Sequence, residues 1–151
     1  MAAPDFSDTY QAILNHIKDC GIRVFHRDIK GGAGGYYDAE KCIITIDKSA
    51  HNKIEGCYYL CHEKIHYDQA RINRFPGFFE MDNIFSEEKL ALIIAAEMDA
   101  VIGGHKMLKK WGINYEPKEM TKAGLEQSTQ FWKEYYFKDI SIKSKKNGVK
   151  P

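Results

Sequence analysis

The sequence predicts an α+β domain in which a first helix and a small sheet precede three further helices. Apolar side chains recur at the helical spacing in four stretches, residues 7–19, 52–73, 87–110 and 119–137. Two stretches rich in β-forming residues, 22–27 and 42–47, lie between the first two helices, and residues 36–37 add a short third strand. We expect an antiparallel sheet of about three strands, with residues 42–47 at its edge.

Length and composition are those of one globular domain. A chain of 151 residues buries roughly 68–70% of the surface that its unfolded form exposes. Hydrophobic residues make up 44% of the chain and charged residues 28%, which is ordinary for a folded protein. We expect one domain over residues 1–140 and a basic, disordered tail over residues 141–151.

The same data disfavour several classes of protein. The net charge of +1 gives no reason to expect a nucleic-acid partner. The start of the chain lacks the basic and apolar segments of a secretory signal, and the longest apolar run, residues 90–96, is far too short to span a membrane. The four cysteines form no C-x-x-C pair, so we interpret them as reduced and expect a cytoplasmic protein.

Two groups of glycines mark places where the backbone needs room. Residues 31–35 are rich in glycine but are not followed by the Gly-Lys-Ser/Thr ending of a phosphate loop. We interpret them as a turn that lets the backbone pass close to a neighbour. Gly103 and Gly104 lie in the third predicted helix, where the missing side chains would let that helix approach the second one closely.

The second predicted helix contains His62-Glu63-Lys64-Ile65-His66, an H-E-x-x-H motif. Residues four apart share one face of a helix, so both imidazoles can bind one zinc ion while Glu63 reaches a metal-bound water. Histidine supplies a neutral nitrogen ligand, and Glu63 can accept the proton of the water, which makes it the candidate general base. The alternative is a pair of partly buried histidines on an amphipathic helix.

Glu97 is the candidate third ligand. It falls on the apolar stripe of the third predicted helix, where an unpaired charge is very costly to bury and therefore needs a partner. A zinc ion is such a partner, and a basic or tyrosine side chain is the alternative. Asp99 is turned about 200° away at the helical period, so geometry favours Glu97 over Asp99.

Other candidates have supporting roles. His105, on the same helix, and Tyr115 are candidate donors of a hydrogen bond to an oxyanion. The aromatic-rich residues 74–85 are either a lid or substrate pocket, or a satellite core beneath a long loop.

Together these residues resemble the minimal core of the gluzincin metallopeptidases, which have a zincin-like fold. The Glu-Met-Asp-Ala segment at residues 97–100 is similar to the E-x-x-A segment of small regulatory peptidases that cleave phage repressors or stress-response regulators. The order of motifs over residues 34–104 also resembles the peptidase family that matures and assembles mitochondrial ATP synthase. The resemblance implies that His62, His66 and Glu97 bind one Zn²⁺ and that Glu63 is the general base.

One departure from the resemblance concerns the support of the ligands. Thermolysin-like members carry an aspartate four residues after the ligand glutamate, where this chain has Val101. The group that orients a ligand histidine must therefore come from elsewhere, with Asp68 and Asp99 as candidates.

The expected activity is zinc-dependent hydrolysis of a peptide or protein substrate that lies along the edge strand. One alternative is a non-catalytic, zinc-stabilised binding or adaptor module, against which the presence of Glu63 argues. Another is an effector or toxin peptidase that is delivered into a different cell.

Overall fold

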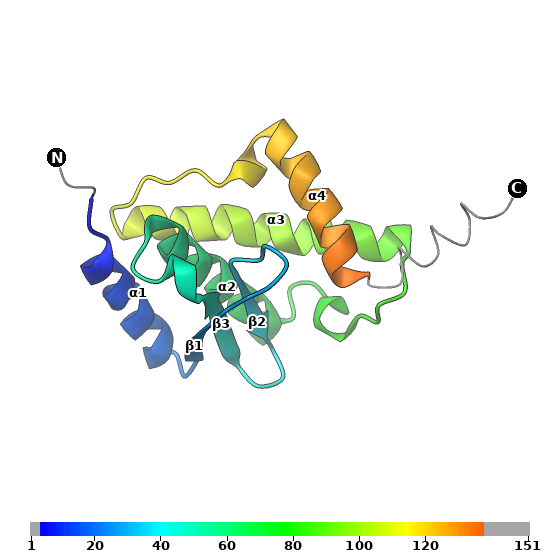
Figure 1. Ribbon diagram of the computed structural model, residues 1–151. Helices are drawn as coiled ribbons and strands as arrows, with labels where there is room; N and C mark the ends of the chain where they lie inside the picture. Colours follow the sequence, from blue (N-terminus) through cyan, green and yellow to red (C-terminus); the bar gives the residue numbers. More distant parts are fainter. Residues whose placement is uncertain (1–3, 138–151) are drawn as a thin grey trace, which may run out of the picture.

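The computed structural model describes residues 4–137, in which helices and strands follow one another in the predicted order (Figure 1). The helices are α1 (Ser7–Asp19), α2 (Ile54–Ile72), α3 (Glu87–Lys110) and α4 (Lys122–Tyr136). The strands are β1 (Arg23–Arg27), β2 (Gly35–Asp38) and β3 (Ile43–Asp47). Single 3₁₀ turns lie at Lys48–Ala50, Phe78–Glu80 and Lys118–Met120. The α+β class is therefore confirmed, whereas the expected tail lies outside the described residues.

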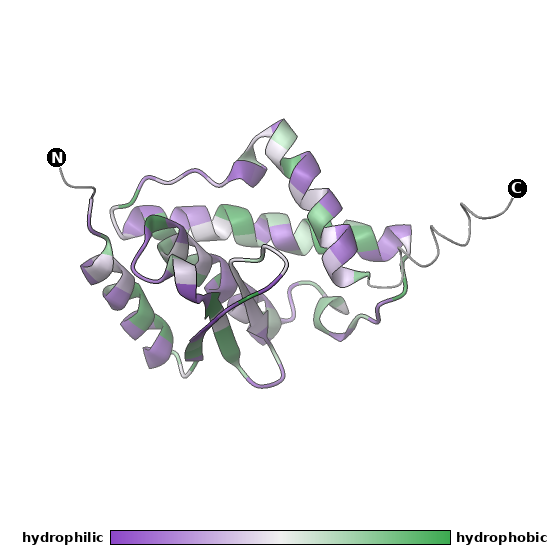
Figure 2. Cartoon of the chain, in the orientation of Figure 1, coloured by the Kyte–Doolittle hydropathy of each residue, from purple (hydrophilic) through white to green (hydrophobic). Residues whose placement is uncertain are grey.

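The three strands form one mixed sheet in the order β1–β3–β2. β3 pairs in parallel with β1 and antiparallel with β2. The prediction of an antiparallel sheet was therefore wrong for β1 and β3, and β3 lies at the centre of the sheet, not at its edge. The composition of β3 explains its place, because a strand whose apolar residues run almost without alternation is typical of a buried position. Figure 2 shows β3 as mostly hydrophobic.

A first hydrophobic cluster lies between α1, the sheet and the first half of α2. Its largest fully buried side chains are Tyr10, Ile13, Ile17, Ile22, Ile44, Ile46, Leu60 and Leu108. This cluster holds α2 against β2 and β3, so that β2 runs beside the helix that carries the H-E-x-x-H motif. Leu108 extends the same core to the end of α3.

Glycine allows two close approaches around α2, as the sequence suggested. A Cβ atom on Gly104 of α3 would lie 3.1 Å from the backbone nitrogen of His62, so the two helices are in near contact at that point. A Cβ atom on Gly34 would lie 2.3 Å from the ring of Tyr59, and one on Gly35 would lie 3.5 Å from Cγ of Glu63. These glycines bring α3 and β2 directly against the motif.

A second hydrophobic cluster lies at the other end of α3. Its buried members are Phe78, Leu90, Ile93, Ala96, Trp132 and Phe137. The aromatic-rich connection after α2 supplies Phe78, which packs near Tyr136 of α4. The satellite-core interpretation of that connection is confirmed for Phe78 and Phe79, which pack in this cluster and also line the cavity described below. A lid or substrate pocket stays a prediction.

The ends of the helices follow local signals. Ser86 caps α3 as predicted, its hydroxyl accepting a hydrogen bond from the backbone N–H of Lys89. α4 begins at Lys122, later than predicted, because Lys118–Met120 forms a separate 3₁₀ turn and Thr121 caps the helix. All four cysteines are free thiols. Among residues 4–137, no helix combines the length and apolarity that crossing a bilayer requires.

Candidate metal centre

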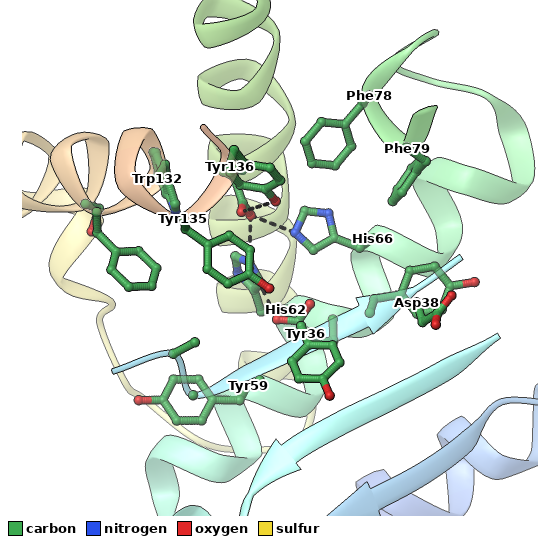
Figure 3. Close-up of a pocket in the computed structure, with 18 of the residues that line it drawn as sticks. Tyr36, Asp38, Tyr59, His62, His66, Phe78, Phe79, Trp132, Tyr135 and Tyr136 are labelled. Atoms are coloured by element: carbon green, nitrogen blue, oxygen red, sulfur yellow. Dashed lines mark hydrogen bonds and ion pairs between the residues drawn. The ribbon is translucent and has the colours of Figure 1, made fainter. Parts of the chain in front are cut away.

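α2 presents His62 and His66 to a cavity beside β2 (Figure 3). Glu63 of the same helix also lines this cavity. His62 and His66 are one helical turn apart, and their ring centroids lie 4.9 Å from each other. Glu63 and His66 are buried, with 6% and 5% of their surfaces exposed, and His62 is partly buried. The predicted pairing of the two imidazoles on one face of a helix is confirmed.

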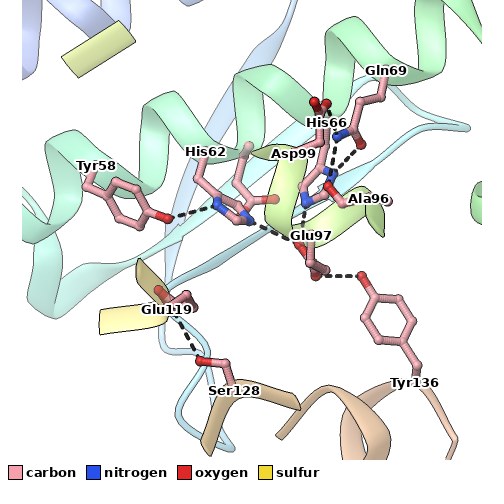
Figure 4. Close-up of polar contacts among 11 residues, drawn as sticks. Tyr58, His62, His66, Gln69, Ala96, Glu97, Asp99, Glu119, Ser128 and Tyr136 are labelled. Atoms are coloured by element: carbon pink, nitrogen blue, oxygen red, sulfur yellow. Dashed lines mark hydrogen bonds and ion pairs between the residues drawn. The ribbon is translucent and has the colours of Figure 1, made fainter. Parts of the chain in front are cut away.

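α3 brings Glu97 to the same point from the opposite side (Figure 4). Its Oε1 lies 3.1 Å from Nε2 of His62 and 2.7 Å from Nε2 of His66. Glu97 is buried, with 6% of its surface exposed, as its place on the apolar stripe predicted. The Tyr136 hydroxyl donates a 2.9 Å hydrogen bond to its other oxygen, Oε2, so the tyrosine partner that the sequence left open is present as well.

The three side chains fit a zinc ion. Four-coordinate zinc holds nitrogen and oxygen ligands at about 2.0–2.1 Å, which places neighbouring ligand atoms about 3.3 Å apart. The separations of 3.1 and 2.7 Å from Glu97 to the two imidazoles are shorter than that value by about 0.2 and 0.6 Å. Ligand atoms of His62, Glu63 and His66 also lie within 4.8 Å of one another. Two imidazole nitrogens and one carboxylate oxygen are three ligands, which would leave the fourth position of a zinc ion to water or substrate.

Burial and neighbouring charges shift the pKa values of Glu63 and Glu97 in opposite directions. Burial raises the pKa of Glu97, but His66 and His62 outweigh it and lower the pKa well below its ordinary value. Burial raises the pKa of Glu63, Glu97 adds to the rise, and the two histidines only partly offset it. Burial lowers the pKa of His66, but Glu97 and Glu63 reverse this and raise it to about 9. Glu97 is therefore the anionic partner of the histidines, and Glu63 is the more basic carboxylate.

Gln69 fixes the orientation of His66 (Figure 4). Its Nε2 donates to the carbonyl oxygen of Ala96 and to Oδ2 of Asp99, at 2.9 Å in each case. The amide oxygen of Gln69 is thereby directed to Nδ1 of His66, 2.8 Å away, and Nδ1 must donate to it. Nε2 is then the nitrogen that faces Glu97, and it would bind a metal once it loses its proton.

Of the two aspartates predicted to orient a histidine, only Asp99 is connected to one. It acts through Gln69, and Arg74 holds it with hydrogen bonds of 3.2 and 3.0 Å to its two oxygens. Asp68 pairs with Lys64 on α2 instead. For the other ligand, Nδ1 of His62 lies 3.1 Å from the hydroxyl of Tyr58.

The three predicted ligands line a cavity of about 600 Å³ that opens between β2 and α4. One wall is formed by residues 32–40 and the other by residues of α4, including Trp132, Tyr135 and Tyr136 (Figure 3). Phe78 and Phe79 line one end, and Tyr59, Lys118 and Glu119 line another part of the wall. The cavity is therefore open to a ligand larger than water.

The structure places His105 and Tyr115 away from this cavity. Nδ1 of His105 donates a 2.8 Å hydrogen bond to the carbonyl oxygen of Tyr115. The ring of Tyr115 packs near Tyr58 at the margin of the first hydrophobic cluster. Neither residue is among those of the described chain that line the cavity. The tyrosine side chains in the cavity come from β2, α2 and α4 instead.

The sequence interpretation missed Tyr58, Gln69, Tyr135 and Tyr136. Two of them carried a local signal, since Tyr58 precedes His62 by one turn and Gln69 follows His66 by three residues on the same helix face. Tyr135 and Tyr136 carried none, because only the packing of α4 across the cavity brings them near the ligands. Comparisons with known protein families, with curated proteins and with solved structures found no match to this chain.

Proposed function

We propose that this protein is a single-zinc metallopeptidase that hydrolyses peptide bonds. The observation that carries the proposal is the convergence of His62, His66 and Glu97 within hydrogen-bonding distance, with Glu63 beside them at the floor of an open cavity. Three protein ligands and one open position are typical of catalytic zinc sites, whereas structural sites are closed by four protein ligands.

Glu63 is the proposed general base. A zinc ion held by His62, His66 and Glu97 would supply Lewis acidity, which would lower the pKa of a bound water to about 7 and polarise a substrate carbonyl. Burial raises the pKa of Glu63, so its carboxylate accepts the proton of the attacking water more readily than an ordinary glutamate does. Glu63 then returns this proton to the departing amine.

β2 is the proposed docking site for the peptide, in place of β3. The backbone N–H of Asp47 donates to the carbonyl oxygen of Gly34, and hydrogen-bonded pairs alternate along an antiparallel ladder. The backbone N–H and C=O of Tyr36 therefore form hydrogen bonds with β3, while those of Gly35 and Tyr37 point to the free edge of β2. A substrate in extended conformation can pair with these groups. Because Gly35 lies against Glu63, pairing there places a substrate carbonyl near the proposed base.

Tyr135 is the proposed oxyanion donor. Its side chain points into the cavity, and 44% of its surface is exposed (Figure 3). Burial raises the pKa of Tyr135, and Glu63 and Glu97 raise it further, so the hydroxyl stays protonated and can donate a hydrogen bond at neutral pH. Tyr136 has a separate role, since its hydroxyl already donates to Glu97.

Cleavage of an unbiased peptide library by the zinc-loaded protein tests this function. We expect cleavage by the wild type and a loss of about 10²–10⁴-fold in Glu63→Gln, with one zinc per chain retained. Asp68→Asn is the matched control, because Asp68 is an acidic residue of the same helix that pairs with Lys64 away from the ligands. Equal cleavage by wild type and Glu63→Gln would remove Glu63 from the mechanism. Zinc and peptide binding with no cleavage by any form would favour an adaptor over an enzyme.

A further inference from the structure

The substrate cleft, defined as the cavity between β2 and α4, has aromatic walls on both sides. β2 contributes Tyr36, whose side chain is 38% exposed, and α4 contributes Phe131, Trp132 and Tyr135. Phe78 and Phe79 add a third aromatic surface beside His66, with the Phe78 ring stacked 5.7 Å from the imidazole. A large apolar side chain of a bound ligand loses water against these rings, which stabilises it in the cleft.

The charged side chains around these walls are mostly acidic. Apart from Glu63 and Glu97, the charged residues that line the cleft are Asp38, Glu40, Asp82, Glu119 and Lys118. Asp82 is paired with Lys89, and Glu119 accepts a hydrogen bond from the Ser128 hydroxyl. Asp38 and Glu40 have no ion pair in the described part of the chain. They place two negative charges at the end of β2.

The position of these charges relative to the site follows from strand geometry. Gly35 lies over Glu63, and Asp38 is three residues further along the same strand. A strand rises about 3.4 Å per residue, so Asp38 lies about 10 Å along β2 from the proposed base. In a ligand that pairs with the free edge of β2, the side chain near Asp38 and Glu40 is thus two to three residues away from the bond to be cleaved.

We infer that the substrate is an extended polypeptide segment with an aromatic or large aliphatic side chain at the cleaved bond and a lysine or arginine two to three residues away. This inference rests on the proposed peptidase function and adds the substrate class to it. A polypeptide fits the alternating peptide groups of β2, and a cationic side chain complements Asp38 and Glu40. The same charges repel phosphorylated and other anionic ligands.

Matched peptides and a charge reversal test this inference. Each peptide carries a central Phe or Leu and one test residue, which is Lys, Gln or Glu. The test residue is placed in turn at each of the three positions on either side of the central residue, and the rest of the peptide is unchanged. We expect the zinc-loaded wild type to cleave the best Lys peptide about fivefold faster, in kcat/KM, than its Gln counterpart, as one partly exposed ion pair provides. The double variant Asp38→Lys/Glu40→Lys should favour the Glu peptide, and Asp38→Asn/Glu40→Gln should lose the preference.

The outcomes separate the inference from the function on which it rests. Cleavage with no preference for Lys, or a preference that both double variants retain, would overturn the substrate class and leave the peptidase function standing. A wild type that binds zinc and cleaves none of these peptides or the unbiased library would overturn both. The Asn/Gln variant guards against misfolding, because Asp38 accepts a hydrogen bond from the backbone N–H of Lys41 that Asn can also accept.

Discussion

At the scale of single residues, Gln69 fixes the orientation of His66 so that Nε2 faces Glu97. Because its amide nitrogen is committed to Ala96 and Asp99, only its oxygen can face the imidazole. Partners of this kind typically contribute 10–100-fold to metal affinity. We therefore expect Gln69→Leu, which keeps similar bulk but removes the acceptor, to weaken zinc binding by about 10–100-fold in chelator competition.

The control for this variant is Asp68→Asn, which removes a charge one residue away on the side of α2 that faces Lys64. It should bind zinc as tightly as the wild type does. Circular dichroism of both proteins checks that the helices are intact. If Gln69→Leu, correctly folded, kept the wild-type affinity, the orientation of His66 would not depend on Gln69.

At the scale of elements, the contact between α2 and α3 requires glycine at position 104 more strictly than at position 103. A Cβ atom at position 104 meets the backbone of His62 at 3.1 Å, whereas one at position 103 meets the side chain of Ile65 at 3.0 Å. A side chain can rotate away, but the backbone of a packed helix cannot. Alanine also favours a helix over glycine by about 1 kcal/mol at both positions. We expect Gly104→Ala to be less stable than Gly103→Ala by about 1–2 kcal/mol in urea unfolding, because the helix preference is equal at both positions and only position 104 is overpacked against backbone. Equal midpoints in urea would show that the helices can separate freely.

The stability of the fold should depend on pH through His26, which lies where α1 meets the sheet. Nε2 of His26 on β1 lies 2.6 Å from the Tyr10 hydroxyl, and its ring centroid is 4.6 Å from that of His51. Burial lowers the pKa of His26, and the charges of His51 and Lys18 lower it further. The unfolded chain thus binds a proton more readily, so stability is retained above pH about 6.5 and lost as the pH falls toward the lowered value.

The variant His26→Gln tests that dependence, because its amide can still bond to the Tyr10 hydroxyl. As the pH falls below about 6.5, His26→Gln should lose less stability than the wild type does. Urea unfolding with a chelator present removes any contribution of bound metal from the comparison. Parallel pH profiles for the two proteins would exclude His26 as the cause.

The elements were more predictable than their pairing. Helical spacing is a local property, so the stripe that carries Glu97 and the cap at Ser86 could be found from the sequence alone. The parallel pairing of β1 with β3 could not, since alternation of apolar residues shows which strands form but not which neighbours they choose. The edge strand was therefore assigned to β3, and the free peptide groups of β2 were overlooked.

At the scale of the whole molecule, the candidate site lies between two hydrophobic clusters. The first joins α1, the sheet and α2, the second joins α3 and α4, and the ligands lie where α2 and α3 cross between them. The H-E-x-x-H spacing predicted that His62, Glu63 and His66 lie together, because that spacing is local. The cleft could not be predicted, because its second wall depends on how α4 returns across α3 to bring Tyr135 and Tyr136 over the ligands.

The zinc content of the purified protein tests the central claim most directly. Elemental mass spectrometry, after reconstitution with zinc and removal of excess, should find one zinc per chain in the wild type and in the control Asp68→Asn. Glu97→Ala should lose it, because only two imidazoles remain to hold the ion. A wild type that binds no zinc, or a Glu97→Ala protein that binds it as tightly as the wild type, would contradict the proposed metal centre.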